Sequence, residues 1–189
     1  MKNNLANMVT GIGVIATILF MTLLFKGYSG LTMIFMVMVI GVTDLLDGKI
    51  ARSFKIVSTL GKSLDRARDK LFACTLFGFE LNRLWGESGL VVVLSAAFLI
   101  AILIFEACLI STWIYGAFRD LDVSAHIWGK RKMWLYFFVA GLFFADVYFI
   151  PVIGKGAFDS IFLFLLFSSA VCAFLSLWGY IERFFPSKT

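Results

Sequence analysis

Four aspartates at regular spacings mark one short stretch of this sequence. The stretch covers residues 44–69 and reads DLLDGKIARSFKIVSTLGKSLDRARD. Side chains three and four residues apart share one face of a helix. One such stripe contains Asp44, Asp47, Gly48, Ala51 and Arg52, and a second contains Gly61, Asp65 and Asp69. Two helices that present these stripes to each other would bring four carboxylates into one small volume.

Carboxylates at such short range favour a metal site. Like charges disfavour each other's ionisation unless a cation lies between them, and all-oxygen ligand sets suit Mg²⁺ or Mn²⁺. Two such ions, about 3.5–4 Å apart, neutralise a phosphoryl group and align the attacking and leaving oxygens. The spacing therefore predicts a site for hard divalent ions with four ligands, Asp44, Asp47, Asp65 and Asp69, and such a site suits chemistry on a phosphoryl group.

Two glycines lie on the same helix faces as these carboxylates. Gly48 and Gly61 carry no side chain there, so a nucleotide can approach the backbone closely. Close packing of membrane helices is the alternative explanation for both glycines. The two roles are compatible, and the position of the glycines favours a nucleotide gap beside the metal site.

The stretch resembles the signature of the CDP-alcohol phosphotransferase family, D-x2-D-G-x2-A-R-x8-G-x3-D-x3-D. All eight fixed positions of that signature match, from Asp44 to Asp69. The alternative is a solvated loop between membrane helices, but such a loop has no reason to confine its carboxylates to helical stripes. Residues 7–13, NMVTGIG, also resemble the N-x-[LI]-T-x-x-[RG] opening of many members, although helix capping or packing explains them as well.

The resemblance implies a reaction and roles for the motif residues. Family members use CDP-diacylglycerol or a related CDP-linked donor, transfer a phosphatidyl-type group to an alcohol, and release CMP. By this resemblance, Asp69 would be both a metal ligand and the base that takes the acceptor's proton, beside three further shared ligands, Asp44, Asp47 and Asp65. The donor site would contain Asp44, Gly48, Ala51, Arg52 and Gly61. The resemblance also implies two Mg²⁺ or Mn²⁺ ions and a homodimer.

Three residues outside the motif bear on the acceptor. Gly129-Lys130-Arg131-Lys132 resembles the G-K-x-K of phosphatidylglycerolphosphate synthases, so Lys130 and Lys132 are predicted to hold a phosphorylated acceptor; a topological patch of basic residues is the alternative. Glu106 lies within an apolar segment, where ionisable residues usually have a function or a partner. Those synthases carry an arginine beside it, where this chain has Phe105, and a later arginine is replaced by Trp113.

These features predict a polyol phosphate as the acceptor. Glycerol 3-phosphate comes first and inositol phosphate next, because lysine and phosphate make charge-assisted contacts. The same chemistry with free inositol or an amino alcohol as acceptor is the alternative.

Composition indicates a membrane protein. Of the 189 residues, 61% are hydrophobic and 22 are phenylalanine, and the mean hydropathy is +0.94. Runs of about 20 apolar residues cross a bilayer as helices. We expect one all-α integral membrane domain over residues 1–189, in contact with membrane lipids. The formal net charge of +5 reflects membrane topology, and we expect no nucleic-acid partner.

Six membrane-spanning helices are expected, over approximately residues 7–25, 31–53, 61–81, 90–118, 132–150 and 158–185. This topology puts all but three of the 17 basic residues on one side, the exceptions being Lys26, Arg83 and Lys155. Basic residues collect on the cytoplasmic side, so both termini and the aspartates should face the cytoplasm. The expected location is the cell membrane of a bacterium or archaeon.

Other functions fit the sequence less well. An aspartate-rich membrane prenyltransferase usually needs more helices and two separated aspartate motifs. A transporter or proton pathway through Glu106 and the aspartates leaves the spacing of the glycines and Arg52 unexplained, and the sequence has no repeat symmetry. A catalytically silent family member would not need the intact motif. Release of CMP from CDP-diacylglycerol would distinguish a phosphatidyltransferase from a transporter and from a catalytically silent family member.

Overall fold

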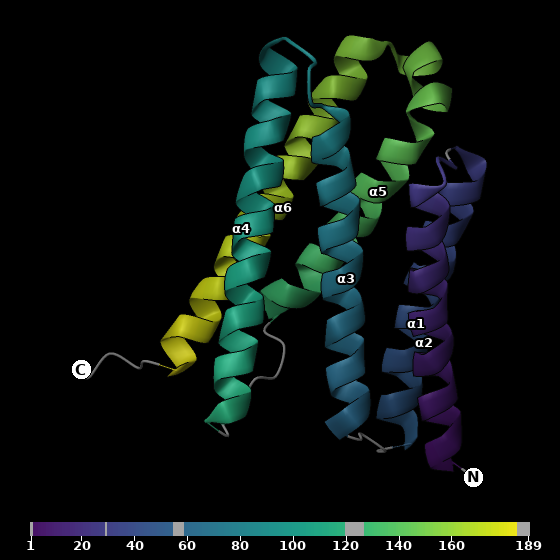
Figure 1. The fold of residues 1–189 in the computed structure, drawn as a ribbon, viewed down its shortest axis with the longest axis vertical. Helices are drawn as coiled ribbons and strands as arrows, with labels where there is room; N and C mark the ends of the chain where they lie inside the picture. The colour runs from purple at the N-terminus through teal and green to yellow at the C-terminus, as the bar shows by residue number, and fades with distance from the viewer. Residues whose placement is uncertain (1, 29, 55–58, 120–126, 185–189) are drawn as a thin grey trace.

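Six helices make up the part of the chain that the structure describes (Figure 1). In this computed structural model the described residues are 2–28, 30–54, 59–119 and 127–184, and for residues 2–10, 47–54 and 59–64 the description covers the backbone only. The helices are α1 (Lys2–Phe25), α2 (Leu31–Phe54), α3 (Thr59–Arg83), α4 (Leu90–Phe118), α5 (Ile127–Ile153) and α6 (Lys155–Phe184). The predictions of an all-helical fold and of six helices are confirmed.

The helices run up and down, so their ends collect at two opposite ends of the bundle. The start of α1, the end of α2 and the start of α3 lie at the same end as the end of α4 and the start of α5 (Figure 1, bottom). The second aspartate stripe begins α3 and the first ends α2. Both stripes are therefore carried to this end, which we call the aspartate end.

Helix α3 joins α1 to α4 and α5, and α2 packs against α5 as a second connection. Helix α3 packs against α1 on one side and against α4 and α5 on the other, while α6 packs on α4 and α5. Among the described residues, α2 and α3 do not pack against each other directly, because α1 lies against both. A gap lined by α1 therefore separates α2 from α3. Asp44 of the first stripe reaches Asp65 and Asp69 of the second across this gap through its side chain.

The prediction that the fifth helix ends at residue 150 is wrong. Helix α5 continues through Pro151 to Ile153, and α6 begins at Lys155. A proline in the last helical turn removes only one backbone donor, whereas the reversal needs a left-handed residue. Gly154 supplies it with a φ of +82°, and its N–H donates to the carbonyl of Ile150 at 2.9 Å. Similarly, α5 begins at Ile127, before the expected start of the fifth helix at residue 132.

Aromatic rings fill the interior. The Phe20 ring of α1 lies 5.2 Å from that of Phe72 on α3, and Phe77 lies edge to face with Tyr136 of α5 at 4.6 Å. Phe20, Phe72, Phe77 and Tyr136 are all buried. Such ring pairs stabilise by about 0.5–1.5 kcal/mol beyond their burial. They join α3 to α1 and to α5 and so help to fix the position of α3, which carries Asp65 and Asp69.

The outside of the bundle is also apolar. Within the described residues, α4, α5 and α6 are long and apolar enough to cross a membrane, and shorter apolar segments cover residues 11–25 of α1 and 31–46 of α2. Large side chains such as Ile104, Phe138 and Phe164 are more than half exposed. A surface of this kind is stable in contact with lipid rather than water.

Candidate active site

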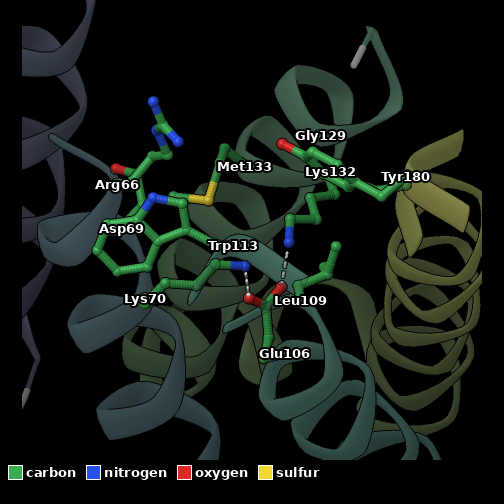
Figure 2. A pocket seen from close by; sticks show the side chains of 11 residues that line it. Arg66, Asp69, Lys70, Glu106, Leu109, Trp113, Gly129, Lys132, Met133 and Tyr180 are labelled. Carbon is green, nitrogen blue, oxygen red and sulfur yellow. Dashed lines mark hydrogen bonds and ion pairs between the residues drawn. The ribbon is translucent and has the colours of Figure 1, made fainter. Parts of the chain in front are cut away.

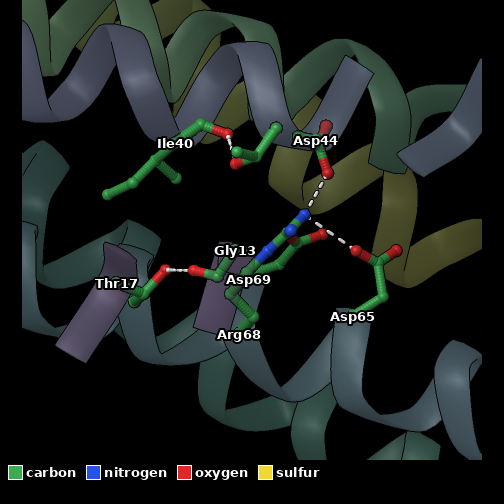
Figure 3. Close-up of polar contacts among 8 residues, drawn as sticks. Gly13, Thr17, Ile40, Asp44, Asp65, Arg68 and Asp69 are labelled. Carbon is green, nitrogen blue, oxygen red and sulfur yellow. Dashed lines mark hydrogen bonds and ion pairs between the residues drawn. The ribbon is translucent and has the colours of Figure 1, made fainter. Parts of the chain in front are cut away.

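Three carboxylates converge at the aspartate end of the bundle (Figure 3). Asp44 comes from α2, and Asp65 and Asp69 come from α3 one turn apart. Each offers an oxygen, and the three oxygens lie within 4.8 Å of one another. The side chains remain 32%, 43% and 25% exposed, respectively. The group, which we call the aspartate cluster, is compact enough to share a metal ion and open enough for one to enter.

A buried arginine occupies the inner side of the aspartate cluster. The Arg68 side chain is only 1% exposed, and its Nη2 forms an ion pair with Asp44. The same nitrogen donates to Oδ1 of Asp65 at 2.8 Å and lies 3.6 Å from Oδ1 of Asp69. Sequence reasoning missed this residue, although its position three residues after Asp65 puts both on one helix face.

Helix α1 leaves room for this arginine at Gly13. A Cβ atom at residue 13 would lie closer than 3.0 Å to Nη1 of Arg68 and 3.4 Å from its Cδ. The Gly13 carbonyl in turn accepts a hydrogen bond from the buried Thr17 hydroxyl at 3.0 Å (Figure 3). The guanidinium therefore fills the gap between α2 and α3, against the bare backbone of α1.

The remaining motif residues are described by their backbone alone. Asp47, Gly48, Ala51 and Arg52 lie in α2, and Gly61 lies in the first turn of α3. The helical backbone puts Asp47 and Gly48 on the face of Asp44. Their side-chain surroundings lie outside the described residues, so their predicted roles stay predictions.

A second ion cluster lies beside the first and has the opposite charge (Figure 2). Glu106 of α4 is 1% exposed and pairs with Lys70 of α3 and Lys132 of α5. The Tyr136 hydroxyl donates to Glu106 Oε1 at 2.8 Å. The position of Glu106 within the apolar α4 thus has a plain explanation, since a carboxylate there needs partners. We call this group the Glu106 cluster.

A cavity connects the two clusters. Asp69 lies in its wall, and so do Lys70, Glu106 and Lys132, together with Leu109, Gly129, Met133, Ser176 and Tyr180. Arg66 and Trp113 also line it, with the guanidinium 5.8 Å from the centre of the indole ring. The cavity wall thus combines a carboxylate of the aspartate cluster with three cationic groups, Arg66, Lys70 and Lys132.

The two lysines predicted from the G-K-x-K resemblance lie differently. Lys132 is buried and lines the cavity, whereas Lys130 is exposed and is not among the lining residues. Lys70 and Arg66 were missed because they occupy variable positions of the aspartate motif. Trp113, where the resemblance led us to look for an arginine, instead carries the guanidinium of Arg66 on its face.

The opposite end of the bundle has a polar cavity of its own. Arg83 at the end of α3 donates to Asp146 at 3.1 Å and lies 3.5 Å from the buried Glu80. All three residues line this cavity, of about 590 Å³. Sequence reasoning assigned no chemistry to Glu80 or Asp146. About three turns of α3 separate Glu80 from Asp69, so this cavity is distinct from the candidate active site.

The structure thus combines an all-helical fold and membrane-length apolar helices with a carboxylate cluster at one end, as expected for a membrane protein. The sequence profile of the CDP-alcohol phosphatidyltransferase family matches residues 3–178. The chain belongs to this family, whose members transfer a phosphatidyl group from a CDP-alcohol to an alcohol. No curated protein sequence matches the chain significantly. The resemblance found in the aspartate motif is confirmed as family membership.

Proposed function

We propose that this chain is a metal-dependent phosphatidyltransferase that moves a phosphatidyl group from CDP-diacylglycerol to a phosphorylated alcohol and releases CMP. The observation that carries the proposal is the convergence of Asp44, Asp65 and Asp69 beside a cavity with cationic walls. In a member of this family, metal ions on the aspartate cluster would bind the donor pyrophosphate, and the cationic cavity would bind the acceptor.

The aspartate cluster has the donor set of a divalent-ion site. Three carboxylate oxygens within 4.8 Å of one another suit a hard ion such as Mg²⁺ or Mn²⁺. We propose that Asp44, Asp47, Asp65 and Asp69 hold two such ions, with Asp47 contributing from the same face of α2 as Asp44. When bound, the ions would offset the negative charge of the pyrophosphate.

Asp69 is proposed as the base. It belongs to the aspartate cluster and also lines the cavity, so an acceptor hydroxyl in the cavity and the donor phosphate would meet at this residue. A base has to come within hydrogen-bond reach of the proton it takes. The donor nucleotide is proposed to lie on the other side, over Asp44, Gly48, Ala51, Arg52 and Gly61.

The cavity walls favour an acceptor that carries a phosphate. Glu106 offsets one of the two ammonium groups of Lys70 and Lys132, and Arg66 adds a further positive charge. With Asp69 also in the wall, the lining carries one net positive charge, and its three cationic groups suit a phosphate. We propose glycerol 3-phosphate first and inositol phosphate next, with free inositol or an amino alcohol as the alternative. Lys130 does not line the cavity but lies in the first turn of α5, two residues before Lys132, and is kept as a candidate contact to the acceptor for that reason alone.

The membrane arrangement completes the proposal. Residues 1–189 would form one domain whose six helices cross the bilayer, with both termini and the aspartate end in the cytoplasm of a bacterial or archaeal cell. Soluble acceptors and CMP would then enter and leave on the side where they occur. The family membership suggests a homodimer as the working form.

The test uses the full chain purified in detergent and mixed with CDP-diacylglycerol and Mg²⁺ or Mn²⁺. Glycerol 3-phosphate, inositol phosphate, glycerol, inositol, serine and ethanolamine are supplied one at a time, and CMP and the lipid product are measured. We expect CMP only with a divalent ion and a phosphorylated acceptor. Product from an unphosphorylated acceptor alone would overturn the choice of acceptor, and no CMP with any acceptor would favour a non-catalytic or transport role.

A further inference from the structure

We propose that Arg68 is a resident cation of the aspartate cluster. It holds Asp44, Asp65 and Asp69 together in the metal-free protein and weakens the binding of the second divalent ion. This inference rests on one part of the proposed function, namely that the aspartate cluster binds metal. The donor, the acceptor and the reaction are not needed for it.

The first support is the geometry at one nitrogen atom. Arg68 Nη2 faces one carboxylate oxygen of each aspartate, always Oδ1. This nitrogen has two hydrogens, and it donates them to Asp44 and Asp65. Asp69 lies 3.6 Å away, beyond hydrogen-bond distance. Arg68 thus competes directly with metal for the oxygens of Asp44 and Asp65 and acts on Asp69 through charge alone.

The second support is burial. The guanidinium is 1% exposed, whereas the three carboxylates are between 25% and 43% exposed. A buried charge is stable only beside opposite charges, so Arg68 needs the carboxylates as much as they need a cation. It approaches them from the protein side, and a divalent ion would reach them from the open side. Both cations can be present together, at the cost of mutual repulsion.

Formal charge then decides how many ions bind tightly. The three described carboxylates and Arg68 together carry a charge of minus two, which one divalent ion balances. With Asp47 the charge becomes minus three, so a second divalent ion would leave a net positive cluster. Without Arg68, the four carboxylates balance two divalent ions. We therefore expect one tight ion and one weak ion in the native chain.

Gly13 offers a way to move the guanidinium without removing its charge from the chain. A Cβ at this position would overlap the space of Nη1, so Gly13→Ala should push the guanidinium away from the carboxylates. Gly11→Ala is the matched control, because a Cβ at Gly11 meets none of the described atoms within 4 Å. Both glycines lie in the same helix, so the general effect of alanine on α1 is shared.

The experiment is a Mn²⁺ titration of the full chain in detergent, without CDP-diacylglycerol or acceptor, in which free Mn²⁺ is followed by electron paramagnetic resonance. Native protein and Gly11→Ala should bind one tight and one weaker ion. Arg68→Gln and Gly13→Ala should tighten the second ion by at least about tenfold, because a neighbouring positive charge is lost or displaced. Arg68→Lys keeps the charge and should retain a weak second ion.

Thermal unfolding in chelator is the second readout. Arg68→Gln should lower the unfolding temperature of the metal-free chain, since the carboxylates then repel each other, and Mn²⁺ should restore it. Identical Mn²⁺ isotherms for native protein, Arg68→Gln and Gly13→Ala would overturn the role of Arg68 while leaving the metal site in place. Binding of two equally tight ions by the native chain would also overturn it. No Mn²⁺ binding by any variant would overturn both the resident cation and the metal site.

Discussion

The two ion clusters of the bundle are built on the same plan with the charges exchanged. In the aspartate cluster a central cation, Arg68, is surrounded by carboxylates. In the Glu106 cluster a central anion is surrounded by two ammonium groups and a phenol. The central group is 1% exposed in both. Each cluster therefore presents a surplus of the outer charge, negative in the first and positive in the second.

This difference gives the two clusters different ligands. Surplus carboxylates attract a hard cation, and surplus ammonium groups attract a phosphate. The clusters meet at consecutive residues of α3, Asp69 and Lys70, which both line the cavity. A helix turns about 100° per residue, so consecutive side chains point to different neighbours. One helix thus places the proposed base next to the proposed anion site.

Replacing the carboxylates should have the largest effect on activity. Asp44→Asn, Asp65→Asn and Asp69→Asn each remove a proposed metal ligand, and Asp69→Asn also removes the proposed base, whose contribution alone is about 10²–10⁴-fold. We expect CMP release to fall by at least that factor in Asp69→Asn and to disappear in chelator for the native chain. Asp47→Asn should behave alike if Asp47 is a ligand.

The control for these variants is Asp146→Asn, since Asp146 lies at the opposite end of the bundle beside Arg83. Its activity should stay close to that of the native chain. Full activity in Asp69→Asn would contradict the assignment of the base, and full activity in all three cluster variants would contradict the metal site.

Breaking the Glu106 cluster should affect stability most. Glu106→Gln leaves Lys70 and Lys132 without their counter-charge, and removal of one member of a buried ion pair typically costs about 3–5 kcal/mol. The unfolding temperature should fall clearly, in contrast to Lys130→Gln at an exposed position. The double variant Glu106→Gln with Lys132→Met removes both charges and should recover part of the loss. Additive effects in this cycle would mean that the pair does not interact.

Much of this arrangement can be predicted from the sequence because it depends on local patterns. Helical periodicity and long apolar runs predict six helices, and the bounds of α2 and α4 agree to within a residue. The spacing of Asp44, Asp65 and Asp69 predicts two helical stripes, and the structure brings these three together. Helix ends were harder to predict. Pro151 lies inside the last turn of α5, and Gly154 ends that helix three residues later.

The central charges could not be predicted in the same way. Lys70 and Glu106 are 36 residues apart, and their pairing depends on how α3 packs on α4. The ion pair of Arg68 with Asp65 could have been predicted, because the two residues are an i, i+3 pair on one helix. The gap that receives its side chain, however, depends on Gly13 in another helix. Pairing across helices is a property of tertiary packing, which motif spacing does not contain.

Weakening the surplus positive charge should change acceptor binding by an intermediate amount. Lys70→Gln and Lys132→Gln each remove one charged donor to a phosphate, worth about 1.5–3 kcal/mol, so the acceptor KM should rise by at least about tenfold. The KM for CDP-diacylglycerol should change little. Lys130→Gln is the comparison: an unchanged acceptor KM would restrict the site to the cavity, and a raised one would extend it to the exposed end of α5.

The smallest expected effect concerns Arg66, which the Trp113 ring supports. The guanidinium lies 5.8 Å from the centre of the indole ring, and a cation over an aromatic face gains about 0.5–1 kcal/mol at an exposed site. Trp113→Leu removes this interaction but keeps an apolar side chain in the cavity wall, so Arg66 should be held less firmly. We expect a rise of a few-fold in the acceptor KM, with the unfolding temperature nearly unchanged. In an Arg66→Gln background the same Trp113→Leu change should have no further effect on KM. An equal rise in both backgrounds would mean that Trp113 contacts the acceptor itself rather than acting through Arg66.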